Sequence, residues 1–310
     1  MPHRANHHIS HKAAYVALAI GVLGIGWSAI FVRLSGVSGS TSAFYRMALA
    51  QLVFVPWRLV APTRKSPLEP GAVIAAVLAG IAFAADLALF NTAIMRTSAG
   101  NATLLGVNAP IFVALGAWMF FGQRPTVAYW SGFVLSFIGM VAIVGTDVIR
   151  HPVLGIGDAM AVGGAICYAV YLLYLQRSRT SIDALTFSAV SGVVASITLL
   201  VICLAIGAPL HGFSIDSWAA LVALALVTQV VGHLCVAYSL GKVPASVASV
   251  VLLAQAPITV VLAVPMLHER ITVAQVVGGL LVLAGIGVVN RRSPRRASVE
   301  PVMANVRVAN

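Results

Sequence analysis

Long runs of apolar residues alternate with short polar segments along almost the whole chain. A transmembrane helix needs about 20 consecutive apolar residues, and most of the runs approach or exceed this length. The expected spans are residues 13–34, 43–60, 71–94, 99–121, 127–145, 157–176, 184–207, 217–240, 245–267 and 273–289. The pattern therefore predicts an all-α integral membrane protein with ten transmembrane helices.

The fourth and ninth runs resemble each other, which indicates an internal repeat. The first copy begins at Thr97 and reads TSAGNATLLGVNAPIFVALGAWMFFGQR, and the second begins at Pro244 and reads PASVASVVLLAQAPITVVLAVPMLHER. The equivalent residues that matter below are Asp86 and His233, Asn108 and Gln255, and Pro110 and Pro257. Each half holds five expected spans, so the second half must cross the membrane in the opposite orientation. The sequence thus predicts a 5+5 inverted repeat, as in many secondary transporters.

The repeats and the polar segments around them divide the chain into five parts. These are a cytoplasmic tail (1–12), a first repeat (13–146), a linker (147–156), a second repeat (157–289) and a basic cytoplasmic tail (290–310). With the N-terminus in the cytoplasm, most lysine and arginine residues of the loops and tails fall on the cytoplasmic side, as the positive-inside rule requires. An even number of spans then places both termini there, and we expect a multi-pass protein of a bacterial inner membrane.

The composition excludes a soluble domain. Hydrophobic residues make up 60% of the chain and charged residues 9%, with a mean hydropathy of +0.99, whereas soluble domains carry about 25% charged residues. The net charge of +11 would suit a nucleic-acid partner, but the charges lie in short loops and tails, so we expect none. The histidines of residues 1–12 lack a nearby carboxylate or cysteine, and we expect neither a metal nor a cofactor.

Two ionisable residues lie near the middle of expected spans, Asp86 in the third and His233 in the eighth. Such groups are costly inside a membrane and are therefore candidates for function. A buried carboxyl group can hold a proton at neutral pH, and imidazole exchanges protons near neutral pH. We predict that both residues bind substrate and that either couples transport to protons. The alternative is that each only forms hydrogen bonds that order the helix bundle.

Uncharged polar and aromatic side chains inside the spans complete the predicted substrate site. An amide offers donors and an acceptor, so it can bind a zwitterion or a heterocycle without carrying charge. The alternative is hydrogen bonding between helices. The further substrate-site candidates are Trp27, Asn91, Asn101, Asn108, Tyr168, Gln229, Tyr238 and Gln255.

Proline and glycine suggest how the spans bend and pack. Pro110 and Pro257 lie within the fourth and ninth spans, where proline kinks a helix, and their equivalence favours a bend beside the substrate path over a static kink. Glycines recur in the fifth and tenth spans and predict close helix contact, either within a scaffold or in a homodimer. These glycines are Gly132, Gly139, Gly278, Gly279 and Gly285.

The repeated segment resembles the EamA-type transporters of the drug/metabolite transporter superfamily. The resemblance rests on the two segments quoted above, each followed by a glycine-rich apolar span, and more loosely on Trp27 and on Phe44-Tyr45-Arg46. It implies ten helices around a central cavity lined by spans one, three, four, six, eight and nine, with spans five and ten at the periphery. The usual glutamate of the family's loop is Gln123 in the first copy and Glu269 in the second. The roles of Asp86 and His233 do not come from the family.

Members of that superfamily move amino acids, drugs, nucleobases and other metabolites, commonly outwards. We therefore predict a secondary active exporter of small amphipathic solutes, working by alternating access, with protons as one candidate for coupling. A facilitative uniporter or channel is the main alternative. An exchanger of phosphorylated sugars is disfavoured, because no lysine is expected in a span interior and only Arg46 lies close to one. No HExxH pattern or nucleophile context is present, so we expect no enzyme.

Overall fold

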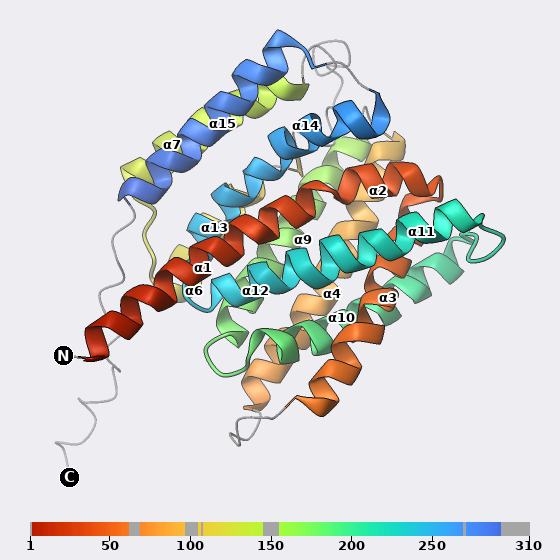
Figure 1. Ribbon diagram of the computed structural model, residues 1–310, viewed down its shortest axis with the longest axis horizontal. Helices are drawn as coiled ribbons and strands as arrows, with labels where there is room; N and C mark the ends of the chain where they lie inside the picture. Colours follow the sequence, from red (N-terminus) through yellow and green to blue (C-terminus); the bar gives the residue numbers. More distant parts are fainter. Residues whose placement is uncertain are drawn as a thin grey trace.

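The computed structural model describes residues 2–61, 69–96, 105–106, 108–144, 155–268 and 271–292. All the regular elements in these parts are helices (Figure 1). Seven described helices are long and apolar enough to cross a membrane, and two shorter apolar helices accompany them. The described structure is therefore that of an all-helical, multi-pass membrane protein, as the hydrophobic pattern predicts.

The helices of the first half follow the expected spans closely. They are α1 (Pro2–Gly26), α2 (Ser28–Ser35), α3 (Gly39–Val60), α4 (Pro70–Arg96), α6 (Ala109–Phe121) and α7 (Val127–Val144). Three starts differ from the prediction. Helix α6 begins at Ala109 rather than at residue 99, and residues 97–104 and 107 lie outside the described part of the chain. The polar N-terminal segment is helical and continuous with the first span, because α1 begins at Pro2. Helix α3 begins at Gly39, where the Ser38 side chain accepts a hydrogen bond from the backbone N–H of Thr41.

The second half contains more interruptions than the sequence predicts. Its elements are α9 (Ile156–Ser178), α10 (Ala184–Ala205), α11 (Ile215–Ala223), η1 (Leu224–His233), α12 (Leu234–Leu240), α13 (Ala245–Val251), η2 (Leu252–Ala254), α14 (Gln255–Leu267) and α15 (Val273–Arg292). The eighth expected span is one rod with a π-helix, η1, in its middle. The ninth is divided by the short 3₁₀ turn η2.

The two equivalent prolines follow helix interruptions. Pro110 lies in the first turn of α6, directly after a turn at Asn108, and Pro257 lies in the first turn of α14, directly after η2. Proline is tolerated in a first turn because the backbone N–H that it lacks would be unpaired there. Each proline thus follows a local departure from α-helical geometry within its expected span, and its role as a bend beside the substrate path stays a prediction.

The first expected span is also broken, at Trp27, between α1 and α2. The carbonyl of Gly26 at this break accepts a hydrogen bond from the hydroxyl of Thr259 on α14 at 2.7 Å. The same hydroxyl lies 2.9 Å from the carbonyl oxygen of Gln255, so the two carbonyls share its single hydrogen. One hydroxyl therefore ties the break in the first span to the beginning of α14.

Helices α7 and α15 pack antiparallel at one edge of the molecule (Figure 1). A Cβ atom added at Gly132 would lie 2.5 Å from the carbonyl oxygen of Gly285. A Cβ atom added at Gly139 would lie 2.5 Å from the carbonyl oxygen of Gly278. A Cβ atom added at Gly278 would lie equally close, 2.5 Å, to the carbonyl oxygen of Gly139. Only glycine allows backbones to approach this closely, so the predicted close glycine contact is confirmed. The contact joins two helices of one chain.

Two further helix pairs position the candidate site. Helix α4 packs along α9, and α1 packs along η1 and α12. Small residues permit the second pairing, since a Cβ atom added at Gly21 would lie 2.9 Å from the carbonyl oxygen of Gly232. Phe83 on α4 also lies in ring contact with His233 at the end of η1, so the two pairs meet there.

Candidate functional site

Arg46 of α3 is the centre of a buried polar cluster. Its side chain is 7% exposed. Its Nε donates a hydrogen bond to Oε1 of Gln229 on η1 at 3.0 Å, and its Nη1 donates to the hydroxyl of Ser28 on α2 at 3.3 Å. Both partners are uncharged. The cluster thus joins three elements that are far apart in the sequence and includes one predicted site residue, Gln229.

His233 is the next partner of Arg46. Nη2 of Arg46 lies 3.3 Å from Nδ1 and 3.4 Å from Nε2 of the ring, and Nδ1 lies 3.0 Å from the carbonyl oxygen of Thr228. A ring nitrogen donates to a carbonyl only when it carries hydrogen, so we assign the proton to Nδ1 and leave Nε2 to accept from Arg46. Both nitrogens of a neutral ring then have partners.

The π-helix η1 supports this arrangement. Thr228 and His233 are five residues apart, the spacing of one π-helical hydrogen bond, and both are buried. The hydroxyl of Thr228 donates to the carbonyl of Gly24 on α1 at 3.3 Å. The wide turn is therefore held from α1 on one side while it presents Gln229 and His233 to Arg46.

Aromatic rings form an apolar wall beside the charged group. The ring of Phe83 lies 5.2 Å from that of His233 and 4.6 Å from that of Tyr171, and the guanidinium carbon of Arg46 lies 5.7 Å from its centroid. The ring of Tyr168 lies 5.8 Å from that of Tyr171. The face of Phe83 favours the cation, and the rings exclude water, which strengthens electrostatic interactions in the cluster.

Asp86 lies one helical turn beyond Phe83 on α4 and is half-buried. A Cβ atom added at Gly164 of α9 would lie 3.3 Å from its Oδ1, so the carboxyl group packs against α9. Asp86 and Arg46 interact electrostatically, without a hydrogen bond between them in the described structure. The structure therefore places the two predicted coupling residues around the same arginine.

The other predicted site residues occupy several places. Trp27 stacks on Phe31, with 5.3 Å between ring centroids, and immediately precedes Ser28 of the cluster. Asn108 donates from Nδ2 to the carbonyl of Leu105 at 3.2 Å before α6 begins. Gln255 begins α14.

Two of the predicted residues bond outside the cluster, and a third cannot be placed. Asn91 donates to the carbonyl of Gly39 at 2.7 Å, which joins α4 to the beginning of α3. Tyr238 is 37% exposed and accepts a hydrogen bond from Nζ of Lys242 at 3.2 Å. Asn101 lies outside the described residues.

Sequence reasoning missed Arg46 because it began the second span at residue 43. The helix begins at Gly39, so Arg46 lies seven residues, about 10 Å, along it. Ser38 followed by Thr41 is a helix-start pattern that signals the earlier beginning. The interior of helix α3 therefore contains a buried cation, contrary to the expectation that Arg46 lies only near a span interior.

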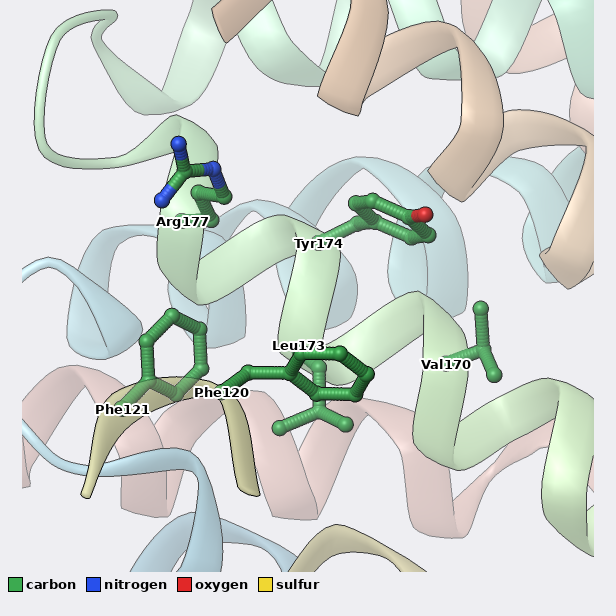
Figure 2. A pocket seen from close by; sticks show the side chains of 6 residues that line it. All are labelled: Phe120, Phe121, Val170, Leu173, Tyr174 and Arg177. Carbon is green, nitrogen blue, oxygen red and sulfur yellow. The ribbon is translucent and has the colours of Figure 1, made fainter. Parts of the chain in front are cut away.

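A pocket of about 310 Å³ lies apart from the cluster, between the end of α6 and α9 (Figure 2). Figure 2 shows two phenylalanine side chains of α6 facing side chains from successive turns of α9. The lining residues are Phe120, Phe121, Val170, Leu173, Tyr174 and Arg177. The lining is mainly apolar, Phe120 is strongly exposed, and none of the predicted site residues contributes. Such a surface suits contact with lipid chains, and we centre the candidate site on Arg46.

The fold defines a helical, multi-pass membrane protein, and comparison with known proteins gives its family. The model of the EamA-like transporter family matches the chain twice, over residues 12–145 and 155–291. The chain therefore belongs to the EamA-like transporter family of the drug/metabolite transporter superfamily, as its repeated segment predicts.

Curated relatives agree with this assignment, and a solved structure shares the fold. The chain is 27% identical to the uncharacterized transporter YyaM of Bacillus subtilis over 256 residues, which cover 80% of this chain and 83% of the relative. It is 26% identical to the threonine/homoserine exporter RhtA of Salmonella typhimurium, covering 86% and 87%. It is also 26% identical to a probable terminal-alkyne amino-acid exporter of Streptantibioticus cattleyicolor, covering 66% and 68%. A protein crystal structure shares the fold, with a TM-score of 0.76, 16% identity and coverage of 90% and 96%.

Proposed function

We propose that this transporter is a secondary active exporter of small metabolites, amino acids among them, and that it works by alternating access. The observation that carries the proposal is the buried cluster around Arg46, with the carboxyl group of Asp86 within electrostatic reach of it. Charged groups inside a membrane are costly and typically mark a substrate or ion pathway. The two relatives named as amino-acid exporters support the direction and the solute class.

The transport mechanism rests on ten spans arranged as an inverted repeat around a central cavity. The seam between α7 and α15 supports the inversion. The sequence repeat pairs Gly132 with Gly278 and Gly139 with Gly285, whereas the contacts join Gly132 to Gly285 and Gly139 to Gly278. A two-fold axis in the membrane plane produces this exchange of partners.

The positions of the helix ends support placing both termini in the cytoplasm. The beginning of α1 and the end of α15 lie on the same side of the molecule, towards the left of Figure 1. An even number of spans requires this, and the bias of basic residues assigns that side to the cytoplasm of a bacterial cell.

The helix breaks are the places where the two halves bend during alternating access. Breaks at Trp27, before Pro110 and before Pro257 interrupt spans that flank the cavity in this arrangement. Interrupted helices concentrate backbone rotation at a few residues, so the segments on either side can move as rigid bodies.

Asp86 is the better of the two candidates for proton coupling. Both ring nitrogens of His233 already have hydrogen-bond partners, which leaves no site for a second proton. The carboxyl group of Asp86 is only half-buried, so a proton can reach it. The groups that interact with Asp86 are Arg46 of α3 and Cys167 and Tyr168 of α9. Asp86 binds either a proton or a cationic group of the solute, and this competition exchanges protons for solute.

The test is transport by the purified protein in liposomes under an imposed pH gradient, with L-threonine and L-phenylalanine as first solutes. We expect saturable, exchangeable flux that drives solute towards the acidic side. Asp86→Asn should keep the flux and lose its response to the gradient. Saturable flux that ignores the gradient in the unmodified protein would instead support a uniporter, and non-saturating flux a channel. Absence of flux across a broad solute screen would refute the transport function for these solutes.

A further inference from the structure

We propose that Arg46 binds the carboxylate group of the transported solute. This inference rests on the proposed transport function and names the chemical group that the site recognises. The solutes it implies carry a carboxylate next to an apolar or aromatic group, and α-amino acids belong to this class.

The first argument is the state of the guanidinium group. A guanidinium group has five N–H donors in a rigid plane, two on each terminal nitrogen. Gln229 takes the Nε donor, Ser28 takes one on Nη1 and His233 takes one on Nη2. Among the described residues these bonds leave one N–H on each terminal nitrogen. Two such donors match the two oxygens of a carboxylate.

The second argument is that none of the described hydrogen-bond partners of Arg46 is an anion, and that Asp86 interacts with it without a hydrogen bond. Gln229 and Ser28 are uncharged, and His233 is bonded as a neutral ring. Leaving a cation in a membrane interior without a bonded anion is costly, and an incoming carboxylate removes much of that cost.

Arg179 shows how an arginine with a structural role is bonded in this fold. Its Nε donates to the carbonyl of Ala237 at 2.9 Å, and its Nη1 donates to the carbonyl of Ile182. These bonds join α9, the following loop and α12. Within the described part of the chain, Arg46 donates no hydrogen bond to a backbone carbonyl, and side chains hold the direction of its guanidinium group instead.

The surroundings of Arg46 select the rest of the solute. Phe83, Tyr168 and Tyr171 offer an apolar surface next to the guanidinium group. When it is ionised, Asp86 adds one negative charge within electrostatic reach of Arg46, and the two residues together are then close to neutral. A zwitterion fits this balance, whereas a phosphate dianion would require additional cations.

The experiment compares solutes of similar size with and without a carboxylate. The probes are L-phenylalanine, L-leucine and L-threonine, each against its carboxamide, together with 3-phenylpropanoate against phenethylamine. Glucose 6-phosphate tests for a phosphate. Binding is measured as ligand-dependent thermal stabilisation of the full-length protein in detergent, and flux is measured in liposomes. The variants are Arg46→Lys and Arg46→Gln.

Arg58→Gln is the matched control, because Arg58 lies on the same helix and donates to the hydroxyl of Thr186 near its end. The unmodified protein and Arg58→Gln should prefer acids over amides by about tenfold or more, the effect of one hydrogen-bonded charge. Arg46→Gln should lose this preference. Arg46→Lys should keep part of it, because lysine retains the charge without the planar fork.

The comparison in the unmodified protein tests the proposal even where an Arg46 variant does not fold. Equal transport of acids and amides, or preference for glucose 6-phosphate, would overturn the carboxylate proposal and leave the transporter intact. If a folded Arg46→Gln protein still prefers acids over amides, another residue must bind the carboxylate. Absence of flux and binding for every probe and every solute of the wider screen would overturn both proposals.

Discussion

Arg46 and His233 are 187 positions apart in the sequence, yet Nη2 of Arg46 lies 3.3 Å from the ring Nδ1 and 3.4 Å from Nε2. Arg46 belongs to the first matched segment and His233 to the second. The candidate site is therefore made by both halves of the chain, and it depends on their correct packing. This relationship also gives His233 a bonding role that is independent of proton transfer.

We predict that His233→Gln preserves transport and its response to a pH gradient. The glutamine amide offers both a donor for the carbonyl of Thr228 and an acceptor for Arg46. His233→Leu offers neither and should lower the unfolding free energy by about 1–3 kcal/mol, because buried polar partners lose their bonds. Thermal unfolding in detergent and liposome flux are the measurements. A stable His233→Gln protein that transports without responding to the gradient would transfer the coupling role from Asp86 to His233.

The glycine seam between α7 and α15 predicts a position-specific effect of one methyl group. Gly285→Ala places a Cβ atom against the backbone of Gly132 and should destabilise the protein by about 1–3 kcal/mol. Gly287→Ala, two residues along the same helix, meets no atom within 4 Å. It should be neutral or stabilise by up to about 1 kcal/mol, because alanine favours a helix. Equal unfolding temperatures for the two variants would contradict the close packing.

The bond between Thr259 and Gly26 predicts that the break at Trp27 needs a hydroxyl on α14. Thr259→Val keeps the side-chain shape but removes the donor, and should lower the unfolding free energy by about 1 kcal/mol. Thr259→Ser restores the hydroxyl and should recover most of the loss. The maximal flux of Thr259→Val and of Thr259→Ser should be measured alongside their stability. Unchanged stability in Thr259→Val would show that the carbonyl of Gly26 finds another donor.

The bonds of Asp183 predict that the free energy of unfolding falls at low pH. It precedes α10, and its oxygens accept from the backbone N–H of Thr186 at 2.9 Å and from its hydroxyl at 2.7 Å. Partial burial alone would raise the pKa of Asp183, but these bonds and the nearby Arg179 and Arg58 outweigh it and lower the pKa from its ordinary 3.8.

A lowered pKa means that the native state favours the ionised carboxyl group. Its contribution is complete above pH 3.8 and is lost as the pH falls through the lower native value. Asp183→Ala should therefore cost about 1 kcal/mol at neutral pH, as loss of a helix cap does, and less in strong acid. Asp183→Asn keeps a side-chain oxygen that can accept from Thr186 but carries no charge, so it separates the effect of the charge from that of the hydrogen bond. Thermal unfolding at several pH values checks this, and a cost that grows as the pH falls would contradict it.

Most of the helix positions were predictable because hydrophobic length determines where a chain can cross a bilayer. The breaks were not, because the residues of η1 and η2 are mainly leucine, valine and alanine, whose apolar pattern does not distinguish α from π or 3₁₀ turns. The rest of the cluster was only partly predictable. Asp86, His233 and Gln229 are polar groups near span centres, whereas the depth of Arg46 depended on a helix start four residues earlier than the apolar run.

The seam between α7 and α15 also bears on how such a chain could arise. Each glycine contact is converted into the other when the two repeats are exchanged. Two copies of a single half-length ancestor, inserted in opposite orientations, could form the same seam between separate chains. Gene duplication and fusion would then keep an existing interface, while the two halves diverged to place arginine in one and histidine in the other.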